Sequence, residues 1–308
     1  MAFDAPRPWL APFSPVGSSG PENGHDGPLR VPAGVPDFDY LTGGIPAGST
    51  VLLLGEAGAG HQEFALTSAA HLMLHHDAPD LHQVFLGSAR GPFAYPNDVA
   101  YVSVSRSREQ VLREVEGSFD PTYHEVLERH LKFHDLSPSY FGDSVVPTSW
   151  SSVENGLLAG LAQGSATVAP AAAPLCALAD ALEFDGPSNL VVVDSLTDLL
   201  VRRGVDSEEL LTLVKGLRRR AKGWGGIVYL LLTKGVAPPA TEAALVDSVD
   251  GVLSFVWSSS PLSSHRQRTM LIERFMPLLS RIPPEHQGRF VIRVSHVSGL
   301  VTTQYERV

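Results

Sequence analysis

A turn, an apolar run and a glycine-rich loop follow one another between Gly43 and Gln62, and they constrain the fold more than any other stretch. The turn, GGIPAG, contains three glycines and a proline, which is typical turn chemistry. Residues 50–54, TVLLL, are apolar enough for a strand that is buried on both faces. The next six residues, GEAGAG, form a loop whose N–H groups can point inward at the start of a helix. The stretch therefore predicts a strand, a phosphate cradle and a helix in succession.

This cradle lacks the two side chains that define a P-loop, whose pattern is G-x-x-x-x-G-K-[ST]. His61 stands in place of the lysine, which normally reaches the β- and γ-phosphates. Gln62 stands in place of the hydroxyl residue that normally binds Mg²⁺. Because histidine has an ordinary pKa of about 6.5, it is mostly neutral at pH 7. We expect weak ATP binding or none, with magnesium binding in question, at Gly55, Glu56, Ala57, Gly58, Ala59, Gly60, His61 and Gln62.

The residues before the loop resemble a known family. Residues 34–49, GVPDFDYLTGGIPAGS, are similar to the lead-in of the KaiC-like and RadA-like branch of the RecA superfamily. The resemblance implies a P-loop NTPase fold of the α/β class: a RecA-like, mostly parallel sheet flanked by helices, with C-terminal antiparallel strands. Residues 1–30 are rich in Pro, Gly and Ser and are expected to form a disordered tail, followed by one such domain over residues 31–308. We expect an archaeal source.

The resemblance also gives a role to Asp194, which ends the apolar run NLVVVD. This is the family's Walker B position, where an aspartate orients magnesium through water. Ligands bind at the carboxyl ends of parallel strands, which agrees with that role. The alternative is that Asp194 only caps the following helix.

A third departure from the family lies after the predicted strand at 99–104. The resemblance implies one or two glutamates there, which polarise the attacking water, but Ser105 and Arg106 occupy these positions. Arginine cannot accept a proton, and no base stands near the serine in the sequence. Together with His61 and Gln62, these replacements predict a chain that has lost ATPase activity and has no catalytic residue.

We therefore expect a catalytically degenerate regulatory or scaffolding subunit. Two alternatives remain open: a slow but active ATPase, and a DNA-recombination accessory protein of the RadA-paralogue type. The family places nucleotide between subunits, so we expect self-association or assembly with an active KaiC-like paralogue. Arg268 or Arg274 falls where the family carries a basic residue that reaches a neighbour's nucleotide.

Composition bears on partners and location. The formal net charge of −10 does not favour general affinity for nucleic acid. The densest basic patch, Arg218-Arg219-Arg220 with Lys215 and Lys222, is either a solvated helix end or a surface for nucleic acid or an acidic partner. Cys176 is the single cysteine, which fits a reducing interior. No stretch reads as a signal peptide or a membrane span, and we expect a cytoplasmic protein.

The hydrophobic pattern predicts alternating strands and helices. A zinc site built on His71, His75, His76 and His82 is a weak alternative to structural histidines. Residues 77–98 are expected to be irregular, and residues 163–174 to form a surface loop. Strands are expected over residues 50–54, 99–104, 131–136, 189–194, 226–232, 249–256, 269–275, 289–297 and 300–304. Helices are expected over residues 61–76, 107–116, 122–131, 151–162, 175–184 and 206–222.

Overall fold

The computed structural model describes residues 29–86, 93–142, 144–147, 150, 173–259, 266–282 and 289–306. Of the predicted tail over residues 1–30, residues 1–28 lie outside the described residues, whereas Arg30 belongs to strand β1. The predicted helix at 151–162 and most of the predicted loop at 163–174 also lie outside the described residues. The strands are β1 Arg30–Val31, β2 Ile45–Pro46, β3 Ser49–Gly55, β4 Val99–Ser103, β5 Leu131–Asp135, β6 Leu190–Asp194, β7 Ile227–Thr233, β8 Gly251–Ser259, β9 Arg266–Arg274, β10 Arg289–Ser295 and β11 Gly299–Glu306. The helices are α1 Pro36–Thr42, α2 His61–Asp77, α3 Pro79–Leu86, α4 Arg108–Ser118, α5 Pro121–His130, α6 Ser137–Phe141, α8 Ala173–Asp185, α9 Leu196–Val201, α10 Ser207–Ala221, α11 Pro239–Ser248 and α12 Met276–Leu279.

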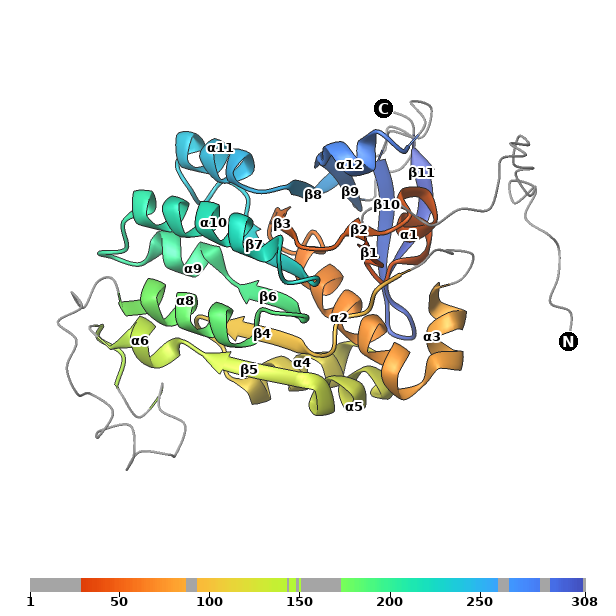
Figure 1. The fold of residues 1–308 in the computed structure, drawn as a ribbon, viewed down its shortest axis with the longest axis horizontal. Helices are drawn as coiled ribbons and strands as arrows, with labels where there is room; N and C mark the ends of the chain where they lie inside the picture. The colour runs from red at the N-terminus through yellow and green to blue at the C-terminus, as the bar shows by residue number, and fades with distance from the viewer. Residues whose placement is uncertain are drawn as a thin grey trace, which may run out of the picture.

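One large sheet organises the molecule, with the strand order β11-β10-β9-β8-β3-β7-β6-β4-β5 (Figure 1). From β8 to β5 the neighbouring strands pair in parallel, and from β8 to β11 they pair antiparallel. The last two strands form the predicted hairpin, in which Ser295 pairs with Gly299. The predicted fold class, a mostly parallel sheet with C-terminal antiparallel strands, is confirmed.

Helices cover both faces of the parallel part, which explains why β3 is apolar throughout. Leu53 belongs to the core on the side of α2, α4 and α5, whereas Leu52 belongs to the core on the side of α8, α9 and α10. Successive side chains of a strand point to opposite faces, so both leucines become fully buried. Figure 1 shows these two helical layers on either side of the strands.

Most predicted elements are found within a few residues of their expected ends. The capping box at the start of α4 is confirmed, because Ser107 Oγ accepts from the N–H of Gln110 at 3.3 Å and Gln110 Oε1 accepts from the N–H of Ser107 at 2.8 Å. The expectation of an irregular segment over 77–98 is wrong for its first part, where α3 forms. Proline at the start favours this helix, and the buried His82 ties it to α2.

Candidate functional site

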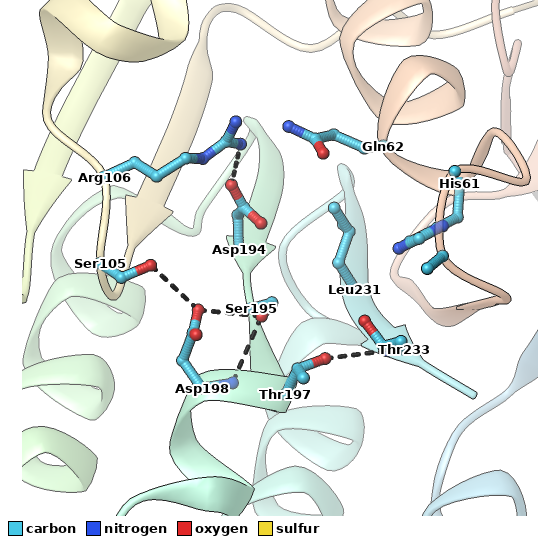
Figure 2. A pocket seen from close by; sticks show the side chains of 12 residues that line it. His61, Gln62, Ser105, Arg106, Asp194, Ser195, Thr197, Asp198, Leu231 and Thr233 are labelled. Carbon is cyan, nitrogen blue, oxygen red and sulfur yellow. Dashed lines mark hydrogen bonds and ion pairs between the residues drawn. The ribbon is translucent and has the colours of Figure 1, made fainter. Parts of the chain in front are cut away.

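A cavity of about 330 Å³ lies at the carboxyl ends of β3, β7, β6 and β4. The strand register places these ends side by side, since Gly55 pairs with Thr233 and Ser103 pairs with Asp194. Figure 2 shows side chains from the ends of β6 and β7, from the segment after β4 and from the starts of α2 and α9 around the cavity. Its lining comprises Ala57, Gly58, His61, Gln62, Ser105, Arg106, Asp194, Ser195, Thr197, Asp198, Leu231 and Thr233.

The glycine loop has the curled form that the sequence predicts. Gly58 has a φ of 70° and Gly60 has a φ of 116°, which are conformations that favour glycine. The N–H of Ala59 donates to the carbonyl oxygen of Glu56 at 2.9 Å, which closes the turn. The N-terminus of α2 follows immediately, so its orphan N–H groups lie beside the cavity.

Not every residue of the predicted cradle lines the cavity. Ala57, Gly58, His61 and Gln62 do, together with Asp194. Gly55, Glu56, Ala59 and Gly60 shape the loop from behind. The Glu56 carboxylate accepts a hydrogen bond from the Trp257 N–H at 3.0 Å, and Ala59 is fully buried in the core.

The His61 side chain is mostly buried, and its Nδ1 has no hydrogen-bond partner among the described residues. Burial lowers the pKa of His61, and the opposing attraction of the Asp194 carboxylate does not compensate. The imidazole is therefore neutral at pH 7. It supplies neither the reach nor the charge of the lysine that it replaces.

Arg106 is the centre of a charged network at one side of the cavity, and Figure 2 shows its contact with Asp194. Its guanidinium forms an ion pair with Asp194, and a second with the Glu114 carboxylate at 2.5 Å. The Tyr101 hydroxyl donates to Asp194 at 2.6 Å and accepts from Arg106 at 2.7 Å. Gln62 Nε2 donates to Glu114 at 3.3 Å, so this network also ties down the start of α2.

The partners of Arg106 in this network stabilise its charged form. Burial alone would lower the pKa of Arg106, but Tyr101, Asp194 and Glu114 outweigh it and raise that pKa. Arg106 is 24% exposed and Asp194 is 12% exposed, so solvent screens their pairing only in part. Arg106, for which the resemblance implies a glutamate, is thus the ion-pair partner of Asp194, the predicted Walker B aspartate.

Asp194 does not cap the following helix, which was the alternative interpretation. Ser195 is the N-cap of α9, and its side chain accepts from the N–H of Asp198. Sequence reasoning missed Asp198, whose Oδ2 accepts from Ser195 at 3.0 Å and from Ser105 at 3.2 Å. The signal was present, because Ser195 to Asp198 has the S-x-x-D spacing of a capping box.

The residues of the site fit a phosphate better than they fit a magnesium ion. The curled loop and the helix N-terminus supply N–H donors, which suit phosphate oxygens. Magnesium requires oxygen ligands in near-octahedral geometry. Here the Asp194 carboxylate is already paired with a guanidinium, and Gln62 directs its amide nitrogen to Glu114. The described part of the chain contains no group of three or more His, Cys, Asp or Glu that could hold a metal ion.

The histidines that suggested zinc have structural partners instead. The ring of His71 is hydrogen-bonded to the Gly34 carbonyl and to the Tyr123 hydroxyl. Burial lowers the pKa of His71 to about 4, so the ring is neutral. His82 Nδ1 lies 2.7 Å from the His71 carbonyl oxygen, and His75 stacks on a tyrosine ring. These contacts join α2 to α3 and α5.

The arginines that the sequence singled out also have partners within the chain. In the basic patch, Arg218 and Lys222 both pair with Asp250, at 2.9 and 2.6 Å. Arg268 lies over the Trp257 ring, at 5.1 Å from its centroid. Arg274 donates to the Val246 carbonyl at 2.6 Å. For the patch, this favours the interpretation as a solvated, internally paired helix end.

The sheet and the site together define an α/β protein with a P-loop-like glycine turn after a central parallel strand. A solved structure of a KaiC-like protein from the hyperthermophilic archaeon Pyrococcus horikoshii OT3 matches this fold with a TM-score of 0.57. The match covers 90% of this chain and 100% of that chain, at 18% sequence identity. The chain therefore has a RecA-like fold, and at this identity the likeness concerns the fold alone.

The sequence matches no protein-family model and no curated protein. Within the described residues, the structure contains no helix with the length and apolar character needed to cross a membrane.

Proposed function

We propose that this chain is a catalytically degenerate, KaiC-like RecA-superfamily subunit that binds ATP weakly or not at all and acts in regulation or scaffolding. The observation that carries the proposal is the ion pair between Arg106 and Asp194. The predicted Walker B carboxylate has a cationic side chain as its partner, and the usual cation at that place would be a metal. The loss of the P-loop lysine and hydroxyl points the same way.

Energetics support weak binding. Breaking a buried ion pair by removing one partner typically costs about 3–5 kcal/mol. The pair here is partly exposed, so its cost is smaller, but MgATP would have to offset it without a lysine or a magnesium hydroxyl ligand. The N–H groups of the loop keep some affinity for phosphate, so binding that does occur is expected to depend little on magnesium.

Calorimetry and a phosphate-release assay test this proposal on the full chain. We expect weak or undetectable MgATP binding and no turnover above background. Asp194→Asn serves as the control, because it should leave that background unchanged. Magnesium-dependent hydrolysis that Asp194→Asn abolishes would replace this proposal with the slow-ATPase alternative.

A degenerate subunit of this kind exerts its effect through its partners. We propose assembly with itself or with an active KaiC-like paralogue, in the cytoplasm of an archaeal cell. Light scattering at micromolar concentration, alone and with paralogues from the source organism, tests this. A monomer under all conditions, with no captured paralogue, would contradict the scaffolding role. Tight binding of single-stranded DNA at physiological salt would instead favour the recombination alternative.

A further inference from the structure

We propose that Arg106 is a resident cation that keeps divalent metal ions away from Asp194 and Glu114, and that these two carboxylates form a latent metal site. This inference deepens the proposed function and rests on it, because both assign Arg106 to the place of a metal. It goes further by assigning the exclusion of metal ions to the Arg106 side chain.

The geometry shows a cation held by two carboxylates and a hydroxyl. Two carboxylates, Asp194 and Glu114, converge on the Arg106 guanidinium from different elements, the end of β6 and the helix α4. The Tyr101 hydroxyl contacts both Arg106 and Asp194. The Gln62 amide reaches the same Glu114 carboxylate from the start of α2.

Charge explains why a metal ion is excluded while Arg106 is present. A divalent ion at Asp194 would lie within a few ångströms of the guanidinium, and like charges at that range repel strongly in a partly buried site. The guanidinium also uses its fixed fork of donors on both carboxylates, which a metal would have to displace. Arginine does not lose its proton, so the barrier persists across the whole pH range in which the protein is folded.

Removal of the guanidinium reverses this balance. The two carboxylates that now share the guanidinium would then lose their common counter-ion, which is unfavourable unless another cation enters. Hard divalent cations prefer carboxylate and hydroxyl oxygens, and those of Asp194, Glu114 and Tyr101 already contact the guanidinium. Asp198 bonds to two serine hydroxyls elsewhere in the cavity wall and is not needed for this site.

The test measures Mn²⁺ binding to the nucleotide-free chain by electron paramagnetic resonance, comparing the unmodified protein with Arg106→Gln. We expect Arg106→Gln to bind one Mn²⁺ about tenfold or more tightly than the unmodified protein. The double variant Arg106→Gln/Asp194→Asn should lose this gain. Arg108→Gln is the matched control, since Arg108 donates to the Glu128 carbonyl and does not line the cavity. It should behave as the unmodified protein does.

Equal Mn²⁺ affinity in the unmodified protein and in Arg106→Gln would overturn the inference, as would a gain that survives Asp194→Asn. If Arg106→Gln does not fold, the test is the comparison of Mn²⁺ affinity between the unmodified protein and its Asp194→Asn variant. Equal Mn²⁺ affinity in those two supports exclusion, and a loss on Asp194→Asn contradicts it. Because no nucleotide is present, failure here is distinct from failure of the proposed function, which would show as ATP turnover.

Discussion

The imidazole of His61 lies directly over the backbone of Gly55, six residues before it in the chain. A Cβ on Gly55 would stand 2.1 Å from Nδ1 of His61 and 2.9 Å from its Cβ. The ring is thus folded back against the end of β3, and Phe255 lies nearby with a ring-centroid distance of 6.4 Å. The first glycine of the loop makes room for the side chain that replaces the lysine.

Gly55→Ala is therefore expected to destabilise the fold by about 1–3 kcal/mol, because the added methyl group collides with a mostly buried ring. His61→Ala should rescue part of this loss in the double variant, since it removes the ring but not the Cβ. Urea unfolding of the four proteins measures the coupling. Gly216→Ala in α10 is the control: a Cβ there meets nothing within 4 Å, so no loss is expected. Additive effects of the two substitutions would contradict the described contact.

The affinity for inorganic phosphate or ADP should increase as the pH falls. Phosphate favours the charged imidazole, so bound anion raises the pKa of His61 and proton binding strengthens anion binding. A histidine with the ordinary pKa of about 6.5 would give this increase near that pH. Burial lowers the pKa of His61, so the increase should begin below that pH. Calorimetry across the acid range measures this affinity. In the control variant His61→Gln, the affinity should not increase as the pH falls.

The stability of the protein should fall between about pH 6.5 and pH 4 because of His71. Its pKa is lowered to about 4 in the folded chain, so the unfolded chain takes up the proton first. The stabilisation is complete above the unfolded pKa and is lost as the pH falls toward the folded one, to an extent of about 3 kcal/mol. Urea unfolding of His71→Gln should show a shallower pH dependence, although it is less stable at neutral pH. An equal pH dependence of stability in the two proteins would show that other titratable groups determine it.

Restoring an ATPase should require changes on both sides of the cavity. His61→Lys with Gln62→Thr should tighten MgATP binding only modestly, because Arg106 still holds Asp194. Adding Ser105→Glu and Arg106→Glu frees that carboxylate and returns the family's water-polarising residues. Turnover should appear only in the fourfold variant, as measured by phosphate release. Turnover in the first double variant would show that the ion pair is no obstacle.

The single domain proposed over residues 31–308 should fold without residues 1–28, whose composition favours disorder. We expect the thermal midpoints of the full-length and truncated proteins to agree within a few degrees. A decrease of about ten degrees or more would mean that the tail packs on the domain.

Local sequence signals predicted the elements that the core depends on, because strands such as β3 are apolar on both faces and α4 begins with a clear capping box. They missed α3, which depends on contacts between His82 and α2. They placed Arg106 where the resemblance implies a glutamate, but they did not predict its pairing with Asp194. That pairing joins residues 88 positions apart, and only the parallel register of β4 and β6 brings them together.

Trp257 couples the glycine loop to the antiparallel strands. Its indole N–H donates to the Ala57 carbonyl at 3.1 Å, its backbone N–H donates to Glu56, and the guanidinium of Arg266 lies 4.8 Å from its ring centroid. The tryptophan thus touches the loop on one side and the β9 strand on the other. A movement of the glycine loop or of β9 is therefore expected to change the fluorescence of Trp257. The ring therefore offers a label-free readout of occupancy of the loop and of partner docking at β9.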